Sequence, residues 1–262
     1  MAQLVRGAYG AHDTQLHINR IGAADLREAL MRGFGDFMAA PTQIFFLCLI
    51  YPVFGYVIAR AAAGGALLPL VWPLLAGFAL IGPVAALGLY ELSRRREQGL
   101  PISWRNMFDV RHSPSIGGIV ALGVILVAIF AIWIGVARLM FHAFIGPVLP
   151  GSFSMLLDQI QQAPGGMTLV VLGNLVGAGF ALLVLALSVI SFPAMLDRQM
   201  TAGEAMSLSL AAFRANPGTI MAWGVMVALL LAAGMATLFV GLAVALPVLG
   251  HATWHLYRKL VG

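Results

Sequence analysis

Long uninterrupted apolar stretches constrain this chain more than any other feature of its sequence. The longest covers residues 219–257. At about 1.5 Å per residue, a helix of that length is nearly twice what one bilayer crossing needs, so the segment must fold back as a hairpin, with a turn expected near residues 234–241. Apolar residues make up 61% of the chain and charged residues only 10%, too few charges to cover a water-soluble globule. The composition excludes a soluble enzyme and leaves a polytopic α-helical membrane protein.

The apolar stretches predict six transmembrane helices arranged as three hairpins, an all-α fold. A helical span needs about 20 apolar residues. The stretches that meet this measure are residues 41–58, 67–90, 116–139 and 167–194, together with the two halves of 219–257. The first 24 residues contain no apolar core typical of a signal peptide. We therefore expect residues 1–24 to form a polar cytoplasmic tail and residues 25–262 to form the transmembrane domain.

The distribution of basic residues predicts which way the spans run. With six spans, thirteen of the fifteen Lys and Arg residues fall on one side of the membrane, and only Arg60 and Arg138 fall on the other. Because cytoplasmic loops carry the excess of basic residues, both termini are expected in the cytoplasm. The basic residues are almost all Arg, and Ala and Gly are abundant, which favours a GC-rich bacterial genome and hence a bacterial inner membrane.

Segments that flank the spans resemble one another, which predicts an internal threefold repeat. Glu28 lies thirteen residues before Pro41, and Glu204 lies thirteen residues before Pro217. A looser copy, at residues 104–110, precedes the third span. Each unit would consist of a surface helix, a span out and a proline-bearing span back. The three copies would cover residues 25–98, 99–200 and 201–262.

The surface helix of the first unit has an amphipathic pattern. Its apolar stripe consists of Leu26, Leu30, Phe34 and Phe37. Opposite-charge pairs four residues apart, Glu28 with Arg32 and Arg32 with Asp36, are expected on the other face. Such helices lie flat at the membrane interface. They either lead the chain back into the membrane between two spans or form a ring that docks partners. We favour the first role.

Few polar groups lie within the predicted spans. No carboxylate or imidazole is expected deep in the membrane, where proton- and ion-coupled transporters hold them. Asn174 is the clearest polar residue, and it lies between Gly173 and Gly177 in a small-xxx-small pattern. This pattern favours close helix packing, with the Asn174 amide bonding between helices, over contact with a substrate.

The densest basic run is Arg94-Arg95-Arg96, at the cytoplasmic end of the second span. It predicts contact with anionic lipid head groups, although its topological role alone would explain it. Glu91 is expected to pair with Arg94 or Arg95. Nucleic-acid binding is not expected, because the charges are spread over several membrane-proximal loops.

The largest loop on the opposite side covers residues 140–166 and is apolar. Turn residues on both sides of residues 152–162 predict one short helix there. This loop would lie on the outer leaflet or pack against a partner.

Several motifs match those of a family of membrane proteins. They are Gly82-Pro83 with the run Gly88-Leu89-Tyr90-Glu91-Leu92-Ser93-Arg94-Arg95-Arg96-Glu97-Gln98-Gly99, Gly35-Asp36-Phe37 with Pro41, and Ser191-Phe192-Pro193 with Leu196-Asp197-Arg198. From about residue 21 onward the chain resembles a bacterial family of six-span integral inner-membrane proteins of unknown function. Some of its members carry the label "putative cytochrome c oxidase subunit I". The resemblance implies neither an established activity nor assigned functional residues.

That label directs attention to the histidines. His251 and His255 lie one helical turn apart and share a face, and His112 is expected at a similar depth. One interpretation makes one of them an axial haem ligand. The favoured interpretation treats them as interfacial polar residues beside Trp254 and Tyr257, in an aromatic belt. We therefore predict no cofactor, no metal site and no catalytic residue.

By elimination, the sequence predicts a non-catalytic integral membrane protein. It contains no Walker loop, Ser–His–Asp set or zinc motif, so an enzyme is not expected. The apolar outer loop and the surface helices favour an accessory or scaffold component that packs against lipids or other integral membrane proteins, such as those of a respiratory complex. The alternatives are a small uncoupled permease or lipid-handling protein, and a haem-binding accessory subunit.

Overall fold

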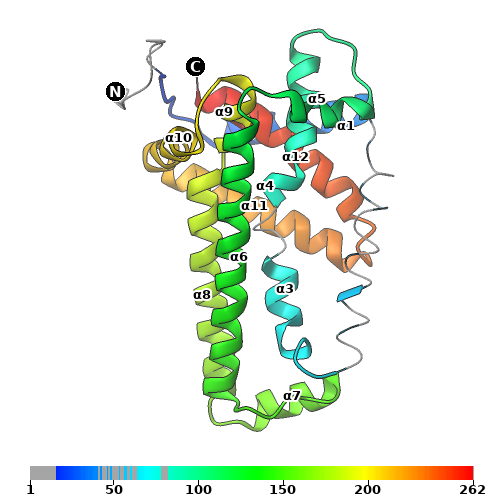
Figure 1. Cartoon of the computed structure of the whole chain (residues 1–262), viewed down its shortest axis with the longest axis vertical. Helices are drawn as coiled ribbons and strands as arrows, with labels where there is room; N and C mark the ends of the chain where they lie inside the picture. The colour runs from blue at the N-terminus through cyan, green and yellow to red at the C-terminus, as the bar shows by residue number, and fades with distance from the viewer. Residues whose placement is uncertain are drawn as a thin grey trace. The chain divides into compact units, whose positions relative to one another are not determined.

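The computed structural model describes residues 16–40, 42, 46, 48, 53, 56–57, 60, 64–77 and 82–261. Over these residues the chain consists of helices joined by turns and loops, with an isolated β-bridge between Ile18 and Val261 (Figure 1). The predicted all-α class is confirmed for this part of the chain. The chain divides into two compact units, residues 1–47, 82–123 and 185–262 in the first, and residues 48–81 and 124–184 in the second. They are described separately.

Three helical segments of the described residues are long and apolar enough to cross a membrane. They are Ile116–Phe144 (α6), Gly166–Asp197 (α8, Gly166–Ser188, with α9, Ser191–Asp197) and Pro217–Ala236 (α11). They cover the predicted third, fourth and fifth spans. The predicted first span, residues 41–58, lies mostly outside the described residues. The count of six is therefore not confirmed.

The predicted second span, residues 67–90, is built from short helical pieces. These are η1 (Leu68–Leu70), α3 (Val71–Gly77), α4 (Gly82–Ala85) and α5 (Leu87–Glu97). Residues 78–81 lie outside the described part. Pro69, Pro73 and Pro83 occur among these pieces. Each lacks the backbone N–H that a continuing helix needs, which favours short segments here.

The last apolar stretch folds back between α11 and α12 (Leu242–Leu260). The connection, residues 237–241, falls within the interval in which the turn was expected. Leu238 and Phe239 have φ values of 52° and 66°, a left-handed conformation that is costly for large side chains. Pro247 lies inside α12.

The first unit is built around three helices that pack against one another, α5, α9 and α12. Three surface helices surround them. Helix α1 (Ala23–Ala39) packs on α12 and α5, η3 (Trp104–His112) packs on α5, and α10 (Ala202–Ala215) packs on α9. The largest enclosed side chains include Leu89, Leu92, Phe192, Met195, Trp254 and Tyr257. Helix α10 begins with a capping box, in which Thr201 and Glu204 bond each other's backbone N–H.

Helix α1 is rotated relative to the expected apolar stripe. Leu26 and Phe37 are buried as predicted, but Phe34 is 50% exposed. The buried face instead includes Ala29 and Gly33, small residues that allow α12 to approach closely. The stripe was predicted wrongly in this respect because side-chain hydrophobicity carries no information about how near a neighbouring backbone will come.

The rotation of α1 also changes its ion pairs. Arg32 pairs with Glu28 at 2.7 Å, as expected. The predicted pair of Arg32 with Asp36 is wrong, because Asp36 lies on the buried face and pairs with Arg96 of α5. Near the start of α1, Lys259 of α12 donates to Asp25 at 3.0 Å and to Glu28 at 2.7 Å.

The second unit contains the predicted helix of the loop 140–166. Helix α7 (Phe153–Gln162) is capped by Ser152, whose hydroxyl accepts from the N–H of Met155, so the predicted helix at 152–162 is confirmed. Its Leu156 is buried with Leu68 and Phe141. The apolar character of the loop is thus used partly within this unit.

Candidate functional site

The carboxylate of Asp36 is the centre of a buried polar cluster in the first unit. Asp36 is only 6% exposed. Its Oδ1 accepts a hydrogen bond from Arg96 of α5 at 2.6 Å. Its Oδ2 accepts from the Ser93 hydroxyl of α5 at 2.6 Å and contacts His255 Nε2 of α12 at 2.8 Å. One carboxylate therefore joins α1 to both α5 and α12. These residues, together with His251, are called the Asp36 cluster below.

The hydrogen bonds of the Asp36 cluster define the tautomer of His251. An ionised carboxylate only accepts, so the single hydroxyl proton of Ser93 is committed to Asp36. The Ser93 oxygen lies 2.8 Å from His251 Nδ1, and Nδ1 must therefore be the donor in that contact. In neutral His251 the other nitrogen, Nε2, is then a bare acceptor. It is fully enclosed and has no hydrogen-bond partner among the described residues.

The surroundings of Asp36 favour its charged form. Burial acts to raise the pKa of the Asp36 carboxyl, but hydrogen bonds from His255 and Ser93, together with the histidine charges, outweigh burial. The resulting pKa lies below the ordinary value of 3.8. Arg96 supplies the balancing positive charge at 2.6 Å. The cluster thus stabilises the fold in its ionised state.

The order of the bonds differs from that of a hydrolytic triad. In such a triad the histidine lies between the serine and the carboxylate, and removes the serine proton. Here Ser93 lies between Asp36 and His251, and its proton points to the carboxylate. Ser93 is also enclosed. The arrangement fits a structural cluster in which helices are joined by satisfied polar groups.

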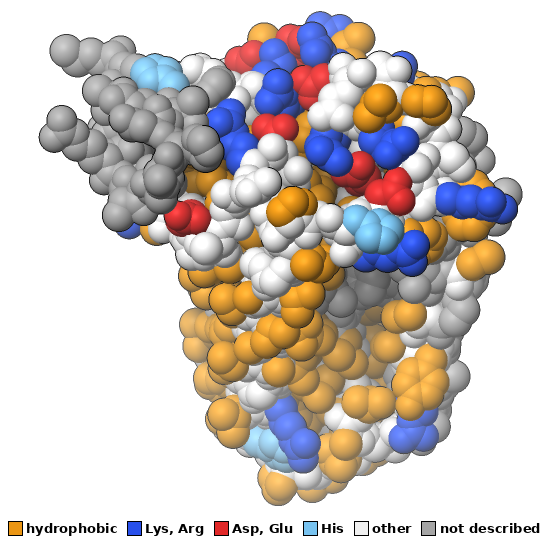
Figure 2. Space-filling model, turned by 45° about the horizontal axis from the view of Figure 1, so that its top comes forward, with side chains coloured by type: hydrophobic (Ala, Val, Ile, Leu, Met, Phe, Trp, Pro, Cys, Tyr) orange, Lys and Arg blue, Asp and Glu red, His pale blue; other side chains and the backbone are white. Residues whose placement is uncertain are grey.

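A second polar network joins the ends of α5, α9 and α12. Tyr257 of α12 donates to Asp197 of α9 at 2.6 Å. Arg258 bonds both Asp197, at 3.3 Å, and Glu97 of α5, at 3.0 Å. Trp254 donates its indole N–H to Glu97 at 2.9 Å. Acidic and basic side chains lie interspersed on the face shown in Figure 2.

The run Arg94-Arg95-Arg96 is divided among three carboxylates. Arg94 makes two bonds to Glu91, at 2.8 and 2.9 Å, which confirms one of the two expected pairings. Arg95 bonds Asp109 of η3 at 3.3 Å, and Arg96 bonds Asp36. Each of the three guanidinium groups therefore already has an intramolecular partner, and contact with lipid head groups stays a prediction.

The three histidines considered as haem ligands are in different environments. His112 is exposed at the end of η3, His251 is enclosed, and His255 bonds Asp36 through Nε2. An axial ligand needs a free imidazole nitrogen that faces the iron. The free nitrogen of His251 is enclosed by packed helices. Among the described residues, no three His, Cys, Asp or Glu side chains lie close enough to hold a metal ion.

In the second unit, one of the two glycines in the small-xxx-small pattern of α8 packs closely against a side chain of another helix. A β-carbon on Gly177 would lie 3.1 Å from the ring of Trp133 of α6, whereas one on Gly173 would meet no described atom within 4 Å. The Asn174 amide donates to Val170 of its own helix at 2.8 Å. Its expected bond between helices is not seen among the described residues.

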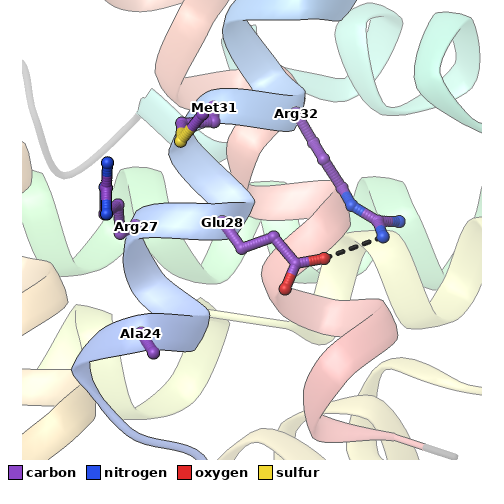
Figure 3. A pocket seen from close by; sticks show the side chains of 5 residues that line it. All are labelled: Ala24, Arg27, Glu28, Met31 and Arg32. Atoms are coloured by element: carbon purple, nitrogen blue, oxygen red, sulfur yellow. Dashed lines mark ion pairs between the residues drawn. The ribbon is translucent and has the colours of Figure 1, made fainter.

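A shallow hollow along α1 is lined by Ala24, Arg27, Glu28, Met31 and Arg32 (Figure 3). All of these residues belong to one helix, and the ion pair between Glu28 and Arg32 crosses the hollow. Sites for small molecules are usually concave and collect polar groups from several elements. This hollow lacks that convergence, and we assign no ligand to it.

Comparison with known proteins supports the membrane class. Residues 71–197 match the model of a family described as predicted integral membrane protein (DUF2189). Comparisons with the curated proteins and with the solved structures gave no match. The chain is an integral membrane protein with several apolar helices, and the match supports its assignment to an uncharacterised membrane family.

Sequence reasoning did not identify the Asp36 cluster as a site. Asp36, Ser93 and Arg96 all occur in the motifs that carry the family resemblance, yet nothing indicated that they would meet. The available signal was the spacing of Ala29, Gly33 and Asp36, which places two small residues on the same helix face as a carboxylate. A face of that kind favours close packing around a polar contact.

Proposed function

We propose that this protein is a non-catalytic scaffold or accessory component of the bacterial inner membrane, with both termini in the cytoplasm. The observation that carries the proposal is that the rest of the described chain buries only a small part of its apolar helices. Within their most apolar windows, only 22% of α6 and 17% of α11 are buried by the chain itself. In our proposal, the surface that the described residues leave uncovered packs laterally against other membrane proteins or lipids.

The polar groups of the described residues support the same conclusion. In the Asp36 cluster, Asp36 and Ser93 are buried and bond neighbouring helices, and the more exposed groups of the network at Asp197 bond one another. Neither collects groups around an open cavity of the kind that substrates occupy. Their arrangement favours a rigid platform that is made by α5, α9 and α12.

The predicted threefold repeat fits this platform. In each case the surface helix of one repeat packs on the returning helix of the repeat before it. Thus η3 packs on α5, α10 packs on α9, and α1 closes the cycle on α12. We propose that the three repeats form a closed ring of helix pairs at the cytoplasmic end of the protein.

The deciding experiment is isolation of the native complex in a mild detergent, followed by mass spectrometry of the proteins that migrate with it. We expect a stoichiometric complex with at least one other integral membrane protein. If the protein migrates as a free monomer or homo-oligomer, and moves a solute or lipid in liposomes, the permease interpretation replaces this one. A visible spectrum of the same sample tests the haem interpretation.

A further inference from the structure

One nitrogen of His251 has no partner in the Asp36 cluster. Nε2 is the one fully enclosed side-chain polar atom of this cluster that lacks a hydrogen bond among the described residues. A buried polar group without a partner costs about 1–3 kcal/mol, and an imidazole nitrogen carries a lone pair that accepts a proton near physiological pH. We propose that His251 is a proton-binding site whose occupancy controls the docking of α1 on α5 and α12.

The geometry favours the neutral form of His251 while α1 is docked. A proton on Nε2 would place a positive charge on a fully enclosed ring, where the backbone carbonyl of Leu89 is the uncharged acceptor at hand. The negative charge of Asp36, which would otherwise compensate, is already balanced by Arg96 at 2.6 Å. His255 lies one turn away on the same helix face and bonds the same carboxylate. A second positive charge at His251 therefore finds no partner in the docked arrangement.

The other ionisable groups around α12 are engaged elsewhere. Glu91 of α5 pairs with Arg94, and Glu97 pairs with Arg258. Helix α11 carries no ionisable side chain. Asp197 of α9 bonds Tyr257 and Arg258, nearer the end of α12. The side chains that face His251 are thus Asp36, Ser93, Arg96 and His255, together with the backbone carbonyl of Leu89.

Proton binding and docking are coupled because α1 forms one wall of the site. Asp36 is its link to Ser93, and Gly33 of α1 lies against the backbone of Ala252, next to His251. When α1 leaves, His251 meets water and titrates as an ordinary imidazole. Docking is then complete at neutral pH and weakens on acidification, by up to tenfold in its equilibrium constant for each pH unit below about 6.5.

Hydrogen–deuterium exchange of the full-length protein in lipid nanodiscs tests the coupling. We expect backbone amides of α1 to lose protection between pH 7.5 and pH 5, after correction for the intrinsic exchange rate. In His251→Asn the side-chain amide keeps a donor for Ser93 but binds no proton, so α1 should stay protected at pH 5. In the control His255→Gln the donor to Asp36 is kept, and the acid response should remain.

Two outcomes overturn the proposal. One is protection of wild-type α1 that does not change with pH. The other is an acid response that survives in His251→Asn or disappears in His255→Gln. If His251→Asn fails to fold, exchange of the imidazole Cε1 hydrogen in the wild type measures the titration of each histidine. His251 titrating near pH 6.5 while α1 stays protected would contradict the coupling.

Discussion

Gly33 of α1 lies directly against the backbone of Ala252 of α12. A β-carbon on Gly33 would fall 2.5 Å from the backbone nitrogen of Ala252 and 2.7 Å from its Cα. Backbone atoms cannot move aside as a flexible side chain does. This contact brings Asp36, one turn further along α1, within reach of α5 and α12.

The first prediction follows from this contact. Gly33→Ala should lower the stability of the protein by about 1–3 kcal/mol, because overpacking forces the two backbones apart. Thermal unfolding in detergent measures the effect. The control is Gly35→Ala, where the nearest described atom to an added β-carbon is Arg96 Nη1, at 3.9 Å. There the better helix propensity of Ala should leave stability unchanged or raise it slightly. Equal melting temperatures for the two variants would contradict the close contact.

The second prediction concerns Asp36. Asp36→Asn should destabilise the protein by about 1–3 kcal/mol at neutral pH, because it weakens the charged acceptor of Arg96, Ser93 and His255. Half-exposed Arg96 can turn to water, which keeps the loss moderate. Asp158→Asn, at an exposed position of α7, is the matched control and should not change stability. Chemical denaturation compares the two variants.

The pKa of Asp36 makes this contribution dependent on pH. Since the pKa is lower in the folded protein than the ordinary 3.8, the ionised carboxylate contributes stability that is fully present above about pH 5. The contribution is lost as the pH falls through 3.8 toward the folded value. The stability difference between wild type and Asp36→Asn should therefore shrink between pH 5 and pH 2.5. A difference that stays constant over this range would show that folding does not lower the pKa of Asp36.

Sequence patterns predicted those features of the fold that depend on local chemistry. The apolar stretches located α6, α8 and α11, and turn residues located α7. Tertiary contacts decided the rest. Phe34 belongs to the apolar stripe by spacing but faces outward, because Gly33 allows a closer approach on the adjacent face. The Asp36 cluster was not predicted, because hydropathy cannot show that a carboxylate in a surface helix will bond one histidine more than two hundred residues away, and be linked to a second through Ser93.

The third prediction concerns α8 in the second unit. Gly177→Leu should lower the melting temperature, because a side chain at this position would overlap the ring of Trp133, with a cost of about 1–3 kcal/mol. Gly173→Leu, one turn away on the same helix, meets open space and should behave as the wild type does. The same loss in both variants would mean that a segment outside the described residues, or a partner, covers Gly173.

The fourth prediction concerns the orientation of the chain. Basic residues gather in the loops that should face the cytoplasm, because Lys and Arg are retained on that side during insertion. Cys48 is first replaced by Ser, so that an introduced cysteine is the only thiol in the chain. Cysteine at Asp158 should then react with a membrane-impermeant maleimide in intact spheroplasts. Cysteine at Arg111, which is exposed at the end of η3, should react only after the membrane is opened. The reverse pattern would place both termini outside and would require the proposed cytoplasmic ring to lie on the other face of the membrane.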